Sequence, residues 1–434
     1  MSEILDRQRT LDLALRVGEM LLSNGAGAAD VTATMSSVAH HLGLRSTLVD
    51  VTFTTVTISH QTAIDEPALS MTRHVNQRET DFADLTAVDH VVALLLADEI
   101  DREEAASRIA QISSSGHPRP RWAITIGWGV SGAGVALLLG GDWIVLLIAA
   151  IAGSAVEILQ RKIARLRLPF FYSQAAGGLL GTLIAVAVAA VDVPVNPSIV
   201  VTAGIIMLLA GLGFIGAFQD ALTGFYITAN ARILEVVIAT VGIIVGVSAG
   251  LSIGSWMGVD VRIDPGATGL SDLPAIITGA AITAAGFAFT AYSPARAIAP
   301  IATIGAGASA VYAVLLQHEV GRAAAAGVAA TLIGLVSYAA ARWARVPPLV
   351  IIVAGIVPLL PGLSIYKSLA LLAQDDYAGL LAMITAVGVA IALSSGAILG
   401  EYIAQPLRRE ARRLEQRLAG PRLVGPFRAR SKRR

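Results

Sequence analysis

Ten apolar segments fill most of the chain between residues 122 and 400, each close to the roughly 20 residues that a helix needs to cross a bilayer. The predicted spans are 122–140, 142–160, 170–190, 198–217, 233–254, 273–290, 297–316, 320–341, 348–362 and 378–400. Hydrophobic residues make up 55% of the chain and charged residues only 15%, values that soluble proteins of this length rarely reach. The sequence therefore predicts a multi-span α-helical membrane protein.

Residues 1–120 have a different character, with 9 Lys/Arg against 17 Asp/Glu. Helical spacing predicts helices over 9–23 and 28–42, a third around Leu85–Leu96, and a fourth at "DREEAASRIAQI", where Asp101 and Glu104 have capping-box spacing. The Thr/Val-rich stretch "STLVDVTFTTVTIS" predicts one strand and "ALSMTRHV" a second. These patterns predict a soluble cytoplasmic α/β (α+β) domain at 1–120, linked to the membrane part by "SSSGHPRPR".

The distribution of basic residues predicts the orientation in the membrane. The N-terminus lacks the basic and apolar regions of a signal peptide, so we expect it to stay in the cytoplasm. Arg and Lys then gather in the loops on the same side, and the loops on the other side carry Asp. The basic segment 406–434 is typical of a cytoplasmic tail beside an anionic leaflet and requires no nucleic acid. Both termini are therefore predicted to lie inside, in a bacterial cytoplasmic membrane.

An internal repeat divides the membrane part. "PSIVVTAGIIMLLAGLGFIGAF" (197–218) aligns without gaps with "PLVIIVAGIVPLLPGLSIYKSL" (348–369), at an offset of 151 residues. This offset predicts two repeats of five spans each, at 121–255 and 256–405. Because five is odd, the second copy must enter the membrane from the opposite side, which gives the inverted repeat of many secondary transporters.

The fourth and ninth spans carry the aligned element. In the ninth, Pro358 and Pro361 each remove a backbone donor, and the freed carbonyls need other partners. Broken helices at matching places in two repeats are where such transporters bind substrate, near the midplane. The alternative is that the prolines only kink a membrane helix.

Several segments resemble the threonine/serine exporter family. They are "LLSNGAGAADVTATMSSVAHHLGL", "DREEAASRIAQI", "GAFQDALTGFYITANARILEVV" (216–237) and "PLLPGLSIYKSLALL" (358–372), and the resemblance covers nearly the whole chain. The chain departs from the family where an acidic residue often follows the first turn: Gly27 and Ala28 stand there, and Asp30 is the nearest acid. The resemblance implies export of small polar metabolites driven by the proton gradient. Our hypothesis for the mechanism is alternating access. Split family members are linked to dicarboxylate export, so a dicarboxylate such as succinate is the alternative substrate to threonine or serine.

Ionisable and helix-breaking residues in or beside the spans are the candidate site residues, because burial of charge in a membrane is costly. The substrate-binding candidates are Gly211, Gln219, Asp220, Asn230, Pro358, Pro361, Gly362 and Lys367. The proton-coupling candidates are Glu157, Asp220 and Glu235. Glu157 has the alternative of a helix-end salt bridge with Arg161, and Lys367 that of reaching the lipid headgroups.

A rival of another class is a membrane-tethered hydrolase that uses the histidines of residues 1–120. No zinc spacing, phosphate-binding loop or nucleophile elbow supports it. With no cysteine in the chain, thiol chemistry and Cys-ligated metals are excluded. We predict a transporter without cofactors whose partners are a small-molecule substrate, protons and the lipid bilayer; a homo-oligomer stays open.

Overall fold

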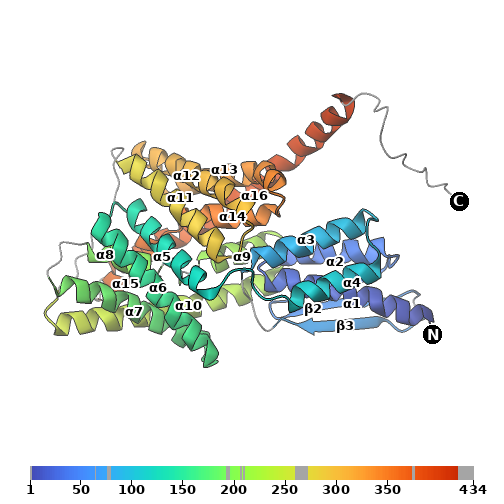
Figure 1. The fold of residues 1–434 in the computed structure, drawn as a ribbon, viewed down its shortest axis with the longest axis horizontal. Coiled ribbons are helices and arrows are strands. Elements are labelled where there is room, and N and C mark those ends of the chain that lie inside the picture. Colours follow the sequence, from blue (N-terminus) through green and yellow to red (C-terminus); the bar gives the residue numbers. More distant parts are fainter. Residues whose placement is uncertain are drawn as a thin grey trace.

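The computed structural model describes residues 2–63, 65–75, 80–191, 196–205, 208, 211–259, 272–373 and 377–418. The chain forms an N-terminal lobe of helices and strands beside a larger bundle of helices (Figure 1). Helix α16 extends out of the bundle toward the C-terminus (Figure 1).

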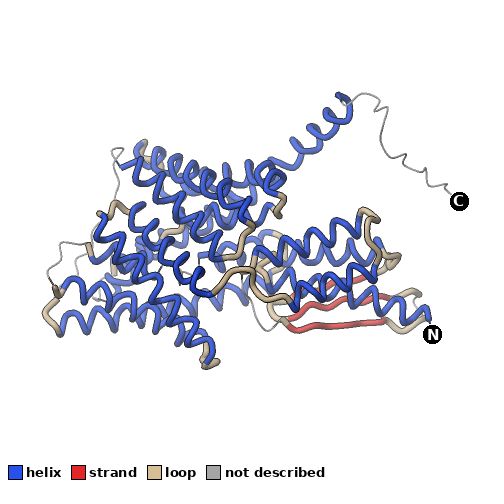
Figure 2. The backbone as a smooth tube through the Cα atoms, in the orientation of Figure 1, coloured by secondary structure: helices blue, strands red, loops and turns tan. Residues whose placement is uncertain are grey.

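In its described residues, the N-terminal lobe contains four helices and one antiparallel sheet. The elements are α1 (Ser2–Ser23), α2 (Ala28–His41), β1 (Thr47–Val51), β2 (Thr55–His60), β3 (Leu69–His74), α3 (Phe82–Leu96) and α4 (Arg102–Ser114). The strand order is β1-β2-β3, and Figure 2 shows the strands along one side of the lobe. Val56 and Ile58 point from β2 into the apolar core, whereas hydroxyl pairs such as Thr57–Thr72 line the exposed face. This alternation is typical of an antiparallel sheet with one wet face.

Residues 46–59 form two strands, and the single strand predicted there is wrong. Thr52 and Thr55 close a turn, in which Thr52 N donates to Thr55 O at 2.9 Å and Thr55 N to Thr52 Oγ1 at 3.2 Å. A threonine hydroxyl that replaces a ladder partner ends a strand locally. The alternation of Thr and Val continues through the turn, so the pattern does not reveal it. The four predicted helices are present, and Asp101 caps α4 as expected by accepting from Glu104 N at 2.7 Å.

The bundle consists of the apolar segments. Its elements are α5 (Arg121–Leu138), α6 (Trp143–Arg165), α7 (Phe170–Ala189), α8 (Pro197–Ile205), α9 (Gly211–Leu222), α10 (Tyr226–Trp256), α11 (Leu273–Thr290), α12 (Ala295–Gln317), α13 (Arg322–Ala344), α14 (Pro348–Ile356), the 3-10 turn η3 (Val357–Leu359), α15 (Gly362–Ala373) and α16 (Ala378–Leu418).

Within the described residues, seven of these helices are long and apolar enough to cross a membrane: α6, α7, α10, α11, α12, α13 and the part of α16 up to Ala404. Large apolar side chains on their outer faces are exposed, for example Leu234, Val241 and Val245 on α10. An exposed apolar surface of this extent marks a contact with lipid or with another protein, and helices of this length and hydropathy fit a bilayer. The chain is therefore a multi-span membrane protein.

The fourth and ninth predicted spans are the ones that break. α8 and α9 occupy the fourth, and α14, η3 and α15 occupy the ninth. Helices α8 and α14 begin 151 residues apart and end 151 residues apart, and the same holds for α9 and α15. α9 packs against α16, and α15 packs against α10, so each broken element contacts the other half of the bundle.

Glycines allow the long helices to approach closely. On α10, Gly242, Gly246 and Gly250 recur every four residues and face α7. A Cβ atom added to Gly246 would lie only 2.0 Å from the carbonyl oxygen of Ala175. Close backbone contact of this kind is how membrane helices gain packing energy without a hydrophobic driving force.

Gly246→Ala should therefore destabilise the protein by about 1–3 kcal/mol, because the helices must separate to admit the methyl group. Gly388→Ala on α16 is the matched control, since nothing lies within 4 Å of its added Cβ. Thermal unfolding of the purified variants in detergent measures the difference. Equal unfolding temperatures for the two variants would contradict close packing at Gly246.

The lobe is docked onto one end of the bundle by a shared core. Phe82 of α3 meets Phe287 of α11 edge to face, with ring centroids 6.4 Å apart, and Phe82 N donates to Ala291 O at 2.9 Å. Arg119 donates to the carbonyl oxygens of Phe289, in the last turn of α11, and of Ser293, just after the end of α11. The buried core of the lobe continues without a break into α11 to α14.

Candidate functional site

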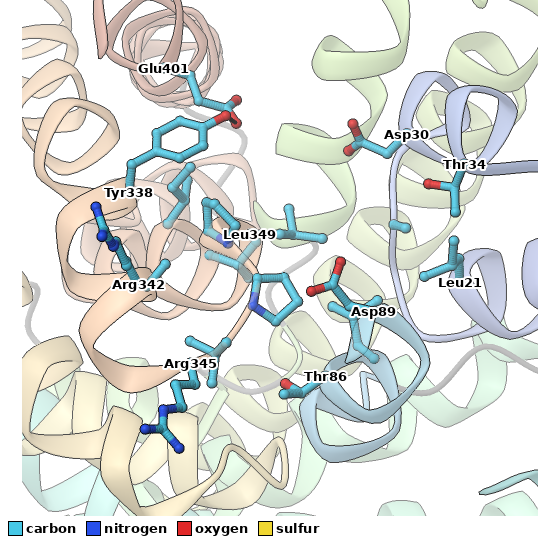
Figure 3. A pocket seen from close by; sticks show the side chains of 18 of the residues that line it. Leu21, Asp30, Thr34, Thr86, Asp89, Tyr338, Arg342, Arg345, Leu349 and Glu401 are labelled. Atoms are coloured by element: carbon cyan, nitrogen blue, oxygen red, sulfur yellow. Dashed lines mark hydrogen bonds between the residues drawn. The ribbon is translucent and has the colours of Figure 1, made fainter. Parts of the chain in front are cut away.

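A cavity of about 960 Å³ lies where the lobe meets the bundle. Helices α2 and α3 form one wall, and α13, α14 and α16 form the other, with α9 at one side (Figure 3). Its polar lining residues are Asp30, Thr34, Thr86, Asp89, His90, Gln219, Arg296, Tyr338, Arg342, Arg345, Ser394 and Glu401. The rest of the lining is largely apolar and includes Ile215, Leu349 and Ile352.

Asp30 projects from the first turn of α2 into this cavity (Figure 3). The side chain of Asp30 is exposed to the cavity. The walls of the cavity, formed by the lobe and the bundle, keep this side chain away from bulk solvent. Desolvation, together with the smaller effect of the negative charges of Glu401 and Asp220, raises the pKa of Asp30 from 3.8 to about 6. Asp30 is therefore mostly ionised at pH 7 and takes up a proton in mildly acidic conditions.

Asp89 adds a second carboxylate from the lobe. It extends from α3 toward the α13–α14 wall in Figure 3. Desolvation also raises the pKa of Asp89, and the neighbouring His90 lowers it in part. The lobe thus presents two carboxylates to the cavity, and both are easier to protonate than an ordinary aspartate.

Glu401 supplies the third carboxylate, from the opposite wall. Tyr338 on α13 donates a hydrogen bond to Glu401 Oε1 on α16 at 2.9 Å. The phenol fixes the carboxylate beside the cavity, across from Asp30 (Figure 3). A fixed acceptor costs less to reorganise when a cation binds.

Positive charge gathers where α13 ends and α14 begins. Arg342 and Arg345 line the cavity there, together with Arg296, whose guanidinium donates to Arg345 O at 2.9 Å. Arg345 adopts a left-handed φ of 51° that ends α13, and Pro347 then caps α14. The N-terminus of α14 adds a positive partial charge at this wall. The cavity therefore offers anionic and cationic groups to one ligand.

Beside the cavity, Asp220 of α9 is fully buried in an ion pair. Its Oδ2 lies 3.0 Å from Nε of Arg232 on α10, and its Oδ1 accepts from Ala28 N at 2.9 Å. The Arg232 guanidinium donates to Ala26 O at 3.3 Å. Asp220 thus caps α2 from 192 residues away, in place of the side-chain cap that Gly27 does not provide.

Glycine at position 27 leaves room for this contact. A Cβ there would lie 3.3 Å from Nε2 of Gln219 and 3.5 Å from Oδ1 of Asp220. Gly25, two residues earlier, adopts a φ of 94°, which glycine tolerates best. The loop between α1 and α2 is therefore shaped to sit against α9.

The structure brings only some of the predicted site residues to the cavity. Gln219 lines it, and Asp220 lies next to it in the buried pair. Gly211 and Gly362 are the first residues of α9 and α15, and Pro358 and Pro361 lie in and after η3, away from the lining. Asn230 and Glu235 are exposed on α10. Lys367 belongs to α15, and its side chain lies outside the described part of the chain, as do residues 419–434 of the predicted tail.

Glu157 lies in a different place, between α5 and α6. It is 7% exposed, accepts from Thr125 Oγ1 at 2.6 Å, and lies 3.4 Å from Arg161. The structure thus has the helix-end salt bridge that the spacing predicts as an alternative to proton transfer. Glu157 does not line the cavity.

Sequence reasoning missed Glu401 and Tyr338, and it gave Asp30 no role. Glu401 follows the predicted end of the tenth span by one residue, and a lone acid after "GAILG" is a usable signal. Asp30 is the first acid after the glycine-rich turn. Nothing in the spacing indicates that these residues, far apart in the chain, share a cavity. Among the described residues, no group of three His, Asp or Glu is arranged to hold a metal ion.

Known proteins match over most of the chain. The family "Putative threonine/serine exporter" matches residues 12–254, and "Threonine/Serine exporter, ThrE" matches residues 277–403. A "Probable threonine/serine exporter" of Mycobacterium tuberculosis is 33% identical over 428 residues, which cover 96% of this chain and 81% of that protein. The "Threonine/serine exporter" of Corynebacterium glutamicum is 32% identical over 410 residues, 93% of this chain and 84% of that protein.

A more distant relative carries a different substrate in its name. The "Probable succinate transporter subunit YjjP" of Escherichia coli is 25% identical over 250 residues, 57% of this chain and 96% of that protein. No solved structure matches the chain with comparable significance.

Proposed function

Because the chain belongs to the threonine/serine exporter family, we propose that it is a secondary active transporter, not an enzyme, which exports threonine and serine across the cytoplasmic membrane. The cavity between lobe and bundle is the inner vestibule where substrate first binds. The observation that carries this proposal is the lining of that cavity, in which carboxylates and arginines occur together.

A zwitterion suits this lining better than a dianion does. The substrate ammonium would meet Asp30, Asp89 or Glu401, and the substrate carboxylate would meet Arg342 or Arg345 and the N-terminus of α14. The second carboxylate of a dicarboxylate would instead be repelled by the negative charges of Asp30, Asp89 and Glu401. A dicarboxylate needs two cationic anchors, and Arg232 and Arg322 are arginines beside the spans that could supply them. Arg232 is paired with Asp220, however, and neither arginine lines the cavity.

Proton coupling in this proposal runs through the vestibule. Asp30, with a pKa of about 6, is about nine-tenths ionised at pH 7 and binds the ammonium from a neutral cytoplasm. Asp30 stays on the cytoplasmic side, so a proton that crosses the bundle from a more acidic exterior would protonate it there, weaken its contact with the ammonium and favour onward transfer of the substrate. Asp30 would then release this proton to the neutral cytoplasm. Asp220 serves here as a positioning residue, because its carboxylate is engaged by Arg232 and Ala28.

The proposed architecture is an inverted repeat. α5, α6, α7 and α10 begin 152 residues before α11, α12, α13 and α16, respectively, which supports repeats at 121–255 and 256–405. The lobe at 1–120 and the tail at 406–434 would be cytoplasmic, as the positive-inside rule predicts. Alternating access would then rock the two halves about the broken elements, in which Gly211 begins α9 and Gly362 begins α15, with Pro358, Pro361 and Lys367 near the crossing.

Transport by purified protein in liposomes tests the substrate. With vesicles preloaded separately with labelled threonine, serine or succinate, we expect efflux of threonine and serine that an inward proton gradient accelerates, and little efflux of succinate. Efflux of succinate without efflux of threonine would replace this proposal with dicarboxylate export. Empty liposomes and liposomes with heat-inactivated protein provide the baseline.

A further inference from the structure

A second concave surface lies on the bundle, between the first turns of α5 and the last turns of α6. This α5–α6 groove has a volume of about 600 Å³ and is lined by Arg121, Trp122, Thr125, Ile126, Ile158, Arg161, Lys162 and Arg165. On each helix these residues follow helical spacing, so two helix faces form the groove. None of them lines the vestibule.

The charge of the α5–α6 groove is strongly positive. Arg121, Arg161, Lys162 and Arg165 all border it, and among the residues that the structure describes no acidic one is part of its lining. Glu157 beneath it engages Arg161 at 3.4 Å and accepts from Thr125 at 2.6 Å. One buried carboxylate therefore offsets one of the cations, and Arg121, Lys162 and Arg165 leave an excess of positive charge at the groove.

The floor of the groove is apolar. Trp122, Ile126 and Ile158 are 68%, 55% and 37% exposed, respectively. Below them, the outer face of α6 continues with exposed Ile151 and Leu147. Trp122 lies at the end of its helix, in the place that tryptophan favours at the boundary between headgroups and acyl chains.

Cationic side chains around an apolar groove at the end of two membrane helices are suited to a ligand that has both an anionic group and an apolar chain. We propose that the α5–α6 groove binds a phospholipid with a net negative headgroup. The phosphate lies among Arg121, Lys162 and Arg165, and one acyl chain runs along Trp122, Ile126 and Ile158. The proposal is independent of the substrate, because it concerns a surface outside the vestibule.

Native mass spectrometry of the full chain tests this proposal. The detergent-purified protein is mixed with equal amounts of phosphatidylglycerol and phosphatidylcholine, and the retained lipid is measured. We expect phosphatidylglycerol to be retained at least about tenfold more than phosphatidylcholine. The triple variant R121Q/K162Q/R165Q should lose this preference, and Arg322→Gln, which removes an exposed cation at the start of α13, should keep it.

Two further measurements ensure that each outcome either supports or contradicts lipid binding. Inorganic phosphate in excess should leave the retained phosphatidylglycerol unchanged; displacement by phosphate would mean that the groove holds a free anion and would overturn the lipid assignment. Equal retention of both lipids by the unaltered protein would also overturn it, whether or not the triple variant folds. If the triple variant is not recovered, Arg165→Gln alone should lower the preference, and an unchanged preference would count against the proposal.

Discussion

Asp220→Ala is expected to destabilise the protein by about 3–5 kcal/mol, because it leaves the buried guanidinium of Arg232 without its anion. Arg232 is 8% exposed and Asp220 is fully buried, so water cannot replace the lost partner. The substitution also removes the acceptor of Ala28 N and leaves the first turn of α2 uncapped. Thermal unfolding in detergent measures the loss, and hydrogen exchange should increase first at the start of α2.

Two comparisons separate the contribution of the Asp220–Arg232 ion pair from the general effect of removing a charge. The double variant D220A/R232A should be less damaged than the sum of the two single variants, because it removes both charges. Glu104→Ala is the matched control: it breaks an exposed ion pair of 2.6 Å with Arg108, for which a loss of at most about 1 kcal/mol is expected. If Asp220→Ala unfolds at the same temperature as Glu104→Ala, the pair does not hold the lobe to α9.

Asp30→Asn is expected to lower threonine efflux at least about tenfold, because a charge-assisted hydrogen bond to the substrate ammonium becomes a neutral one. In the unaltered protein, efflux should fall as the pH on the lobe side is lowered through about 6, where Asp30 takes up a proton. The variant should lack this step in its pH profile. Asp30→Glu, which keeps the charge, should retain part of the efflux.

The stability of Asp30→Asn separates lost transport from lost folding. The folded protein raises the pKa of Asp30 from 3.8 to about 6, so it favours the protonated form. The stabilisation from this group is complete below 3.8 and disappears as the pH rises to about 6. At pH 7 the neutral asparagine should therefore be at least as stable as the ionised aspartate. Asp50→Asn, on the exposed side of β1, is the control for charge removal, and full efflux with an unchanged pH profile in Asp30→Asn would exclude Asp30 from coupling.

The sequence alone determined the features that depend on neighbouring residues or on a repeated segment. Apolar runs of bilayer length predicted the membrane helices, and Asp101 predicted the start of α4. The gapless repeat from Pro197 and Pro348 indicated the two broken elements, whose helix bounds keep the 151-residue offset. Such features can be predicted from the sequence because lipid contact, capping and helix breaking depend on residues within a few positions of one another.

Only the tertiary structure decided which distant residues meet. Asp220 was a candidate for substrate or proton binding from its place beside the repeat, and the fold engages it with Arg232 and the N-terminus of α2. Asp30 and Glu401 come together because the lobe docks on α13 to α16, and the shared cavity raises the pKa of Asp30. Spacing along a chain reports which face of a helix is buried, but the partner of that face is set by packing between helices that the sequence separates by hundreds of residues.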